Sequence, residues 1–200
     1  RGSKRRRFTE QSSTGTEPPD RNSLRQSVQS APILTGAENG ELEVVKKNYD
    51  LTGIYVNENN ETPLFLAAEN GHLEVVKWLA DKDPESVNFK ANLGYTPLLV
   101  AAENGHFEVV EWLADNGGSV EQAKDDGQTP LLVAAQNGHL EVVQWLADNG
   151  GSVEQADNDG QTPLWYAAKY EEYEIVEFLA KKNSKLIAQQ NKHGETPLFT

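Results

Sequence analysis

The 200-residue sequence contains no cysteine and no methionine. Without cysteine it can form no disulfide, no thiolate zinc site and no cysteine nucleophile, which fits a reducing compartment. No apolar run approaches the roughly 18 residues that would span a bilayer. The basic N-terminus is not followed by an apolar segment, so it does not resemble a secretory signal. Because even a starting methionine is missing, we expect a fragment or a processed form of a longer protein.

Basic residues are scarce outside the N-terminal segment. The net charge is −13 and the sequence pI is about 4.7. Residues 1–30 hold seven of the 18 basic residues but only three of the 31 acidic ones. Since phosphate binding depends on lysine and arginine, the acidic remainder is a poor surface for nucleic acid. The Lys4–Arg7 cluster is the one place where we expect that a nucleic acid could bind.

Residues 1–30 are predicted to form a disordered basic arm. They are rich in Arg, Ser, Gln, Thr and Pro, and Phe8, Leu24 and Val28 are their only large apolar side chains. Such a segment cannot bury enough apolar surface to offset the entropy of ordering it. The Lys4–Arg7 run has three open interpretations: a nuclear localisation signal, a nucleic-acid arm or a solvated charge run.

A Thr-Pro-Leu tripeptide recurs at spacings of 34, 33, 33 and 34 residues. Its copies begin at Thr62, Thr96, Thr129, Thr162 and Thr196, and Ala31-Pro32-Ile33 begins a weaker copy. A fixed period of this length is typical of a one-dimensional stack of supersecondary units. We therefore predict an array at 31–200. It comprises a degenerate first repeat at 31–61, repeats at 62–95, 96–128, 129–161 and 162–195, and a truncated copy at 196–200.

Each period is interpreted as a pair of helices. Thr129 can cap a helix whose first residue is Pro130, and Gly138 can end that helix in a left-handed conformation. A second helix follows, with Leu140 and Val143 on its apolar face. The Asn-Gly pairs that follow these segments favour β-hairpins in isolation, but their flanks have helical periodicity and predict helix ends instead.

The pattern Thr-Pro-Leu-x-x-Ala-Ala-x-x-Gly-His-x-Glu-Val-Val stands whole at 62–76, 96–110 and 129–143. On these residues the chain resembles the ankyrin repeat family, and the resemblance covers about residues 31–200. It implies an all-α ankyrin-repeat solenoid, in which stacked helix–turn–helix pairs carry projecting hairpin-like loops. Members of this family mostly bind proteins through the loop tips and the inner helices, so the resemblance also implies a binding function.

The chain departs from the family pattern at several positions. The family often has histidine after Thr-Pro-Leu, whereas this chain has large apolar residues, so we expect apolar packing there. These residues are Phe65, Leu99, Leu132, Trp165 and Phe199. In the repeat at 162–195, Lys169–Tyr173 replaces the usual Gly-His segment. Glu171 stands at the glycine position, and we expect the turn to be reshaped because glutamate tolerates a left-handed conformation poorly.

Histidines and carboxylates recur at the same register of successive repeats. Packed elements of adjacent units lie about 8–10 Å apart, whereas the ligands of one zinc lie about 2 Å from it. We therefore expect His72, His106 and His139 to make hydrogen bonds near the start of the second helix rather than to share a metal. Glu74 and its equivalents complement the helix dipole. We predict no catalytic, cofactor or metal site.

The partner-binding surface is predicted on the loop tips, which vary among the repeats, and on the first helices. The predicted contacts are Glu58, Asn59, Glu61, Glu69, Asn92, Leu93, Tyr95, Glu103, Asp125, Asp126, Gln128, Gln136, Asn158, Asp159, Gln161, Trp165, Tyr166, Lys169 and Tyr170. By analogy with the family this is the concave face. Its acidity predicts a protein or peptide partner with basic residues and a few apolar anchors.

Aromatic residues of the second helices, Trp78, Trp112 and Trp145, are expected to pack between neighbouring helices. The cluster around Trp165 and Tyr166 is open to two interpretations: a hot spot for a partner, or core packing.

We expect a non-catalytic protein-interaction scaffold inside the cell, cytoplasmic or nuclear, with no membrane association. The alternative is a targeting or regulatory segment of a larger multidomain protein, such as a host-directed effector that acts in the host cell interior. In that case the basic arm is a localisation signal or an autoinhibitory element, which occupies the acidic groove in cis at a raised effective concentration.

Overall fold

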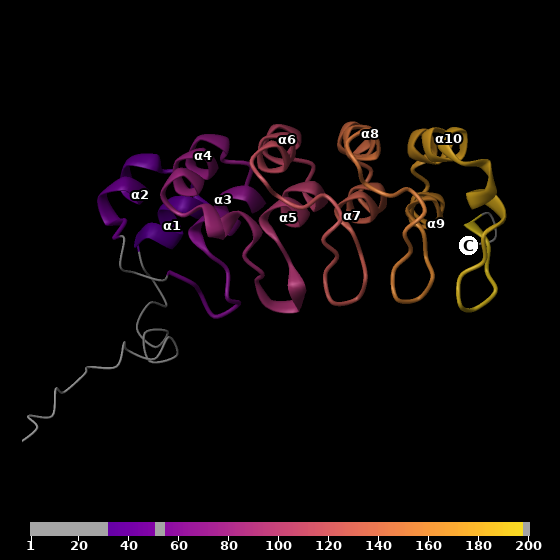
Figure 1. The fold of residues 1–200 in the computed structure, drawn as a ribbon, viewed down its shortest axis with the longest axis horizontal. Helices are drawn as coiled ribbons and strands as arrows, with labels where there is room; N and C mark the ends of the chain where they lie inside the picture. The colour runs from indigo at the N-terminus through magenta and orange to yellow at the C-terminus, as the bar shows by residue number, and fades with distance from the viewer. Residues whose placement is uncertain (1–31, 51–54, 198–200) are drawn as a thin grey trace, which may run out of the picture.

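The computed structural model describes residues 32–50 and 55–197, which form a row of paired helices (Figure 1). The predicted arm, Phe199 and the end of the truncated copy lie outside these residues. The inner helices are α1 (Pro32–Glu38), α3 (Pro63–Glu69), α5 (Pro97–Glu103), α7 (Pro130–Gln136) and α9 (Pro163–Lys169). The outer helices are α2 (Leu42–Asn48), α4 (Leu73–Lys82), α6 (Phe107–Asp115), α8 (Leu140–Asp148) and α10 (Tyr173–Lys182). Short 3₁₀ helices lie at Pro84–Asn88, Asn92–Gly94 and Ser184–Ala188.

The paired helices form two layers, with the outer helices along the top of Figure 1 and the connecting loops along the bottom. Each inner helix packs against the inner helices of the neighbouring repeats and against the outer helix of its own repeat. The described residues contain helices and turns but no strand. This arrangement confirms the predicted all-α solenoid. None of the described helices combines the length and hydrophobicity needed to cross a bilayer.

The predicted Thr-Pro caps begin the inner helices of four repeats. In each, the threonine Oγ1 accepts a hydrogen bond from the backbone N–H three residues later, at donor–acceptor distances of 3.1 to 3.3 Å. The capping residues are Thr62, Thr96, Thr129 and Thr162. Such a bond satisfies one of the free amides of the first turn, and the proline that follows loses no hydrogen bond. The sequence therefore predicts where these helices begin.

The inner helices are buried more completely than one apolar face would require. In α7, every residue from Pro130 to Ala135 is buried, although the sequence pattern predicted burial of one face. The reason is that α5 and α9 pack on its two sides and α8 covers a third. Ala101 and Ala134 are both fully buried, and their small side chains allow the inner helices to lie close together. The core is therefore continuous along the stack.

Aromatic residues of the outer helices lie at the edge of this core, as predicted. Trp78, Trp112 and Trp145 are half-buried and pack against the core cluster, and Phe178 occupies the equivalent position on α10. The Trp78 ring contacts Tyr49 edge to face, with centroids 5.2 Å apart. At this edge of the core, part of the apolar area of each ring is removed from water.

The large apolar residues after Thr-Pro-Leu are also buried, as expected. Phe65, Leu99, Leu132 and Trp165 are all at most 4% exposed. Apolar packing therefore occupies the place where the family often has histidine.

The turn after α9 keeps its conformation despite losing its glycine. Glu171 has φ 63°, which is close to the values of 73° and 77° at the equivalent Gly105 and Gly138. The expectation of a reshaped turn was wrong. The neighbouring backbone explains this, because the Glu171 N–H still donates to the Ala168 carbonyl and the Glu172 N–H to the Ala167 carbonyl. Packing of α9 against α10 holds a conformation that glutamate does not favour.

Replacing Glu171 with glycine is expected to stabilise the array. The left-handed conformation costs a side-chain-bearing residue about 1–2 kcal/mol, so we expect the free energy of unfolding to rise by about 1 kcal/mol. Urea denaturation followed by circular dichroism measures this change. Glu171→Ala is the matched control, since alanine keeps the Cβ atom and gives no such gain. An unchanged midpoint for Glu171→Gly would show that this turn is not strained.

Candidate partner-binding surface

Five connecting loops project from the inner layer and are here named the tip loops (Figure 1). They comprise residues 57–61, 91–95, 124–128, 157–161 and 191–195. Each is closed by a hydrogen bond from the backbone N–H of its first residue to the carbonyl of its last, at 2.8 to 3.1 Å. A single backbone hydrogen bond of 2.9 to 3.0 Å joins each loop to the next. The tip loops therefore form one continuous row, which with the adjoining ends of the inner helices makes up the tip-loop face.

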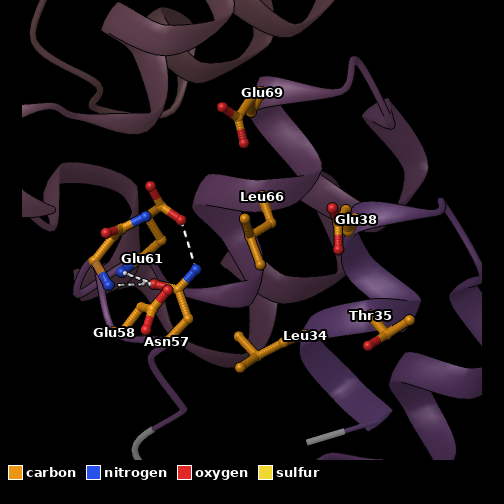
Figure 2. A pocket seen from close by; sticks show the side chains of 9 residues that line it. Leu34, Thr35, Glu38, Asn57, Glu58, Glu61, Leu66 and Glu69 are labelled. Carbon is orange, nitrogen blue, oxygen red and sulfur yellow. Dashed lines mark hydrogen bonds between the residues drawn. The ribbon is translucent and has the colours of Figure 1, made fainter. Parts of the chain in front are cut away.

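An acidic hollow opens at the α1 end of this face (Figure 2). Its volume is about 550 Å³, and Leu34 and Leu66 line it together with four glutamates. The glutamates are Glu38, Glu58, Glu61 and Glu69. Asn57 holds one of them in place, because its Nδ2 donates to Glu61 Oε2 at 2.6 Å and its Oδ1 accepts from the Glu61 N–H at 3.0 Å. The hollow combines two apolar side chains with four carboxylates, of which Glu61 is held in place by Asn57.

A second hollow of about 200 Å³ continues along the face toward α5. It shares Glu61 and Glu69 with the first hollow and adds Tyr95 and Glu103. Phe65 also contributes to its lining. The sequence predicted Glu61, Glu69, Tyr95 and Glu103 as partner contacts, but not Phe65. The two hollows share lining residues and are here together called the acidic depression.

Two carboxylates of this depression have raised pKa values. Burial raises the pKa of Glu69, and the neighbouring carboxylates of Glu61, Glu38 and Glu103 raise it further. Burial also raises the pKa of Glu103, although nearby Lys124 opposes the effect. In both cases the charged form is less favourable here than in water. A cation bound in the depression would relieve this repulsion.

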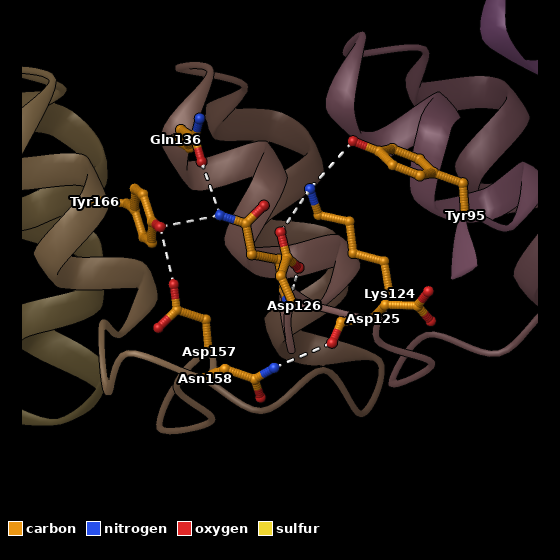
Figure 3. Close-up of polar contacts among 9 residues, drawn as sticks. Tyr95, Lys124, Asp125, Asp126, Gln136, Asp157, Asn158 and Tyr166 are labelled. Carbon is orange, nitrogen blue, oxygen red and sulfur yellow. Dashed lines mark hydrogen bonds and ion pairs between the residues drawn. The ribbon is translucent and has the colours of Figure 1, made fainter. Parts of the chain in front are cut away.

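Lys124 links two neighbouring tip loops (Figure 3). Its Nζ donates to Tyr95 Oη at 3.1 Å and pairs with Asp126 Oδ2 at 3.0 Å, while lying 4.8 Å from the centroid of the Tyr95 ring. Burial lowers the pKa of Lys124, but its hydrogen bonds to Tyr95 and Asp126 raise it overall. The ammonium group is therefore charged and committed to these two partners.

A second polar network links the next repeats (Figure 3). The Tyr166 hydroxyl donates to Asp157 Oδ2 at 2.9 Å and accepts from Gln128 Nε2 at 3.0 Å. Gln128 Nε2 also lies 3.3 Å from Gln136 Oε1. Burial, followed by the hydrogen bond to Asp157, raises the pKa of Tyr166. These bonds fix the spacing of the loops and leave Gln128 and Tyr166 buried.

The aromatic cluster on α9 is mostly internal. Trp165 is 4% exposed and Tyr166 is 9% exposed, and both pack against Leu132. Of the two interpretations left open by the sequence, core packing therefore describes these two side chains. Tyr170 remains 47% exposed and stacks on Tyr166, with the Lys169 ammonium 5.5 Å from its ring centroid. Trp165 and Tyr166 are buried because α9 packs closely against α7.

The predicted contact residues fall into three groups by exposure. Ten are exposed: Glu58, Asn59, Asn92, Leu93, Asp125, Asp126, Asn158, Asp159, Lys169 and Tyr170. Six are half-buried: Glu61, Glu69, Tyr95, Glu103, Gln136 and Gln161. Gln128, Trp165 and Tyr166 are buried. Whether the accessible members bind a partner stays a prediction.

Sequence reasoning missed several residues that shape the face, among them Glu38, Asn57 and Lys124. Glu38 has the same register as Glu69, so aligning the weak first copy with the others would have found it. Asn57 and Lys124 both begin a tip loop, a position where only the repeat period offers a signal.

The charge of the inner layer changes along the array. The residues that end the inner helices are, in order, Glu38, Glu69, Glu103, Gln136 and Lys169. The last residue of the inner helix is therefore acidic in α1, α3 and α5, neutral in α7 and basic in α9. Aspartates of the tip loops carry negative charge along the array beyond α5.

The in-register histidines connect repeats. In His72, His106 and His139, the ring Nε2 lies 2.9 Å from the carbonyl oxygen that ends the preceding inner helix. Since a carbonyl can only accept, Nε2 carries the proton. The expected hydrogen bonds exist, but they reach the previous repeat rather than the histidine's own helix. Among the described residues, no cluster of three or more His, Asp or Glu side chains could hold a metal.

Comparison with known proteins supports the architecture. A family model described as ankyrin repeats in three copies matches residues 33–125 and residues 116–191. Together these matches reach from α1 into the last tip loop. No curated protein matches the sequence.

Proposed function

Because this chain belongs to the ankyrin repeat family, we propose that it is a non-catalytic scaffold that binds a protein segment on its tip-loop face. Ankyrin repeats are generally protein–protein interaction modules. The partner segment carries lysine or arginine and occupies the concave, acidic depression between α1 and α5. The observation that carries this proposal is the pair of adjoining hollows, which share Glu61 and Glu69 and in which the charges of Glu38, Glu61 and Glu103 all act on Glu69.

The electrostatics of the depression favour such a partner. Burial raises the pKa values of Glu69 and Glu103, and neighbouring carboxylates raise them further. A lysine or arginine side chain would lower that repulsion on binding, and the surrounding negative charge would speed the encounter. Tyr95 lines the same hollow, and its ring already contacts one cation, the Lys124 ammonium, 4.8 Å from the ring centroid. The charge and the lining of the depression thus select the same class of side chain.

The test uses a displayed library of random linear peptides, selected on the full chain. We expect the selected peptides to be enriched in lysine and arginine. We further expect the double substitution Glu69→Gln and Glu103→Gln to weaken their binding by about tenfold or more. Isothermal titration of the selected peptides measures both affinities.

The same double variant also measures the electrostatic repulsion among the carboxylates of the depression. A folded-state pKa above the unfolded value means that the native state binds more protons, so stability rises as pH falls through the folded pKa. Glu69→Gln with Glu103→Gln is therefore expected to raise the melting temperature at neutral pH, and the gain should vanish in acid. Glu108→Gln with Glu141→Gln removes equal charge from exposed positions on the outer helices. The proposal would be contradicted if both double substitutions weakened peptide binding equally, or if the library selection returned acidic peptides.

The alternative function is a targeting or regulatory segment of a larger protein, such as a host-directed effector inside a host cell. One observation favours a regulatory role for the basic arm: the larger acidic hollow is lined by Leu34, Thr35 and Glu38 of α1, the helix that directly follows the arm. Residues Lys4–Arg7 would then compete with the partner. Replacing all four with serine in the full chain would strengthen binding of the selected peptides in this case, and identical affinities would argue against it.

A further inference from the structure

The tip loop at 91–95 has a different turn from its neighbours. In three other loops the first residue is Asn57, Asp157 or Asn191, whose side-chain Oδ1 accepts two backbone N–H groups of the same loop. Ala91 has no side-chain oxygen and cannot make these bonds. The loop instead forms a short 3₁₀ turn in which Leu93 adopts φ 60° and ψ 14°.

Leu93 is held in this conformation by both neighbouring loops. Its carbonyl accepts from the Asp125 N–H at 2.9 Å, and the adjacent Asn92 N–H donates to the Asn59 carbonyl at 3.0 Å. A left-handed conformation is unfavourable for a leucine, whereas asparagine adopts it more readily. The Leu93 side chain is nevertheless 70% exposed. The fold therefore gains almost no apolar burial from a residue whose backbone it strains.

The surroundings of Leu93 are acidic on both sides. On one side it lines a hollow of about 310 Å³ with Lys124, Asp125 and Asp126. On the other, its neighbours in the loop, Asn92 and Tyr95, line the hollow that contains Glu61, Glu69 and Glu103. An exposed aliphatic side chain thus stands between two groups of carboxylates.

We propose that Leu93 is the apolar anchor of the tip-loop face, and that its partner segment carries an apolar side chain flanked by lysine or arginine. This inference rests on the function proposed above and names the partner's chemistry more closely. An apolar partner side chain would bury the exposed Leu93, while its basic neighbours reach Asp125 on one side and Glu103 on the other. Strained backbone conformations cluster at functional sites. A second copy of this chain is a poor partner, because its carboxylates would lie against the same carboxylates here.

The test is Leu93→Asn in the full chain, because asparagine fits the left-handed backbone and removes the apolar contact. The probe is the tightest peptide from the library selection, together with a copy in which its apolar residues are replaced by serine. We expect Leu93→Asn to raise the melting temperature by about 2–4 °C and to weaken binding of the parent peptide about tenfold or more. Binding of the serine copy should change little, because the contact is already absent.

A matched control separates relief of strain from loss of the anchor. Glu171→Gly relieves a left-handed residue away from Leu93, so it should raise the melting temperature without changing peptide affinity. If the unaltered chain selects no basic peptides, the proposed function and this inference both fall. If it binds such a peptide and the Leu93→Asn chain binds it equally well, the anchor alone is overturned.

Discussion

Replacing Leu131 with alanine is expected to lower the free energy of unfolding by about 2–5 kcal/mol. Leu131 lies on α7 in the middle of the stack and is 0% exposed. A Cβ atom added at Gly151, three residues after the end of α8, would lie 3.2 Å from the Leu131 Cδ1 atom. The neighbouring inner helices α5 and α9 flank the site on both sides. Since the surrounding helices are fixed by their own neighbours, the cavity cannot collapse fully.

The loss at Leu131 should extend beyond its own repeat. In a one-dimensional stack, the stability of each unit depends on its contacts with the units before and after it. Urea denaturation measures the total change, and amide hydrogen exchange should show reduced protection in α5 and α9 as well as in α7. Gln144→Ala, at an exposed position on α8, is expected to change stability by no more than about 0.5 kcal/mol. A cost below about 1 kcal/mol for Leu131→Ala would mean that the stack relaxes around the missing side chain.

The sequence predicted those parts of the fold that depend on local rules. Thr129 and Pro130 specify the start of α7 through a cap and a fixed backbone angle, and both are visible in the sequence. The period then places every repeat by the same rule. Glu171 shows the limit of local rules, because packing between α9 and α10 keeps a turn whose glycine has been lost.

The candidate site was predicted in outline, and its details depend on contacts between repeats. The acidic residues of the loops and inner helices could be found from the period alone. The bond between Lys124 and Tyr95 joins residues 29 apart, and the bond between Gln128 and Tyr166 joins residues 38 apart. A single sequence carries no signal for such pairs. The sequence left Trp165 open between a partner contact and core packing for the same reason, since its burial depends on Leu132 of the preceding repeat.

Replacing Gly105 with alanine is expected to lower the free energy of unfolding by about 2–3 kcal/mol. Gly105 has φ 73°, a conformation that alanine adopts only with strain. A Cβ atom at this position would lie 2.5 Å from His139 Nδ1, so the imidazole ring must move. That movement breaks the 2.9 Å hydrogen bond from His139 Nε2 to the Glu103 carbonyl. The expected loss combines the backbone strain with the loss of this bond between repeats.

A second glycine separates these two contributions. Gly117 has φ 93°, but a Cβ atom added to it would meet no other atom within 4 Å, so Gly117→Ala carries the backbone strain alone. We expect it to cost about 1–2 kcal/mol, and the difference between the two variants reports the displaced histidine. In a His139→Ala background, Gly105→Ala should cost no more than Gly117→Ala. If Gly105→Ala still cost more stability than Gly117→Ala in that background, the extra cost would not come from losing the His139 hydrogen bond.

Gly105→Ala and Gly117→Ala also test whether the His139 hydrogen bond affects partner binding. The carbonyl that receives the His139 bond belongs to Glu103, the last residue of α5, whose side chain lines the acidic depression. Moving the ring would release this helix end and displace a carboxylate that the partner must meet. We therefore expect Gly105→Ala to weaken binding of basic peptides at temperatures where the variant is still folded, while Gly117→Ala leaves the affinity unchanged. Equal affinities for both would show that the histidine bonds stabilise the stack without positioning its binding surface.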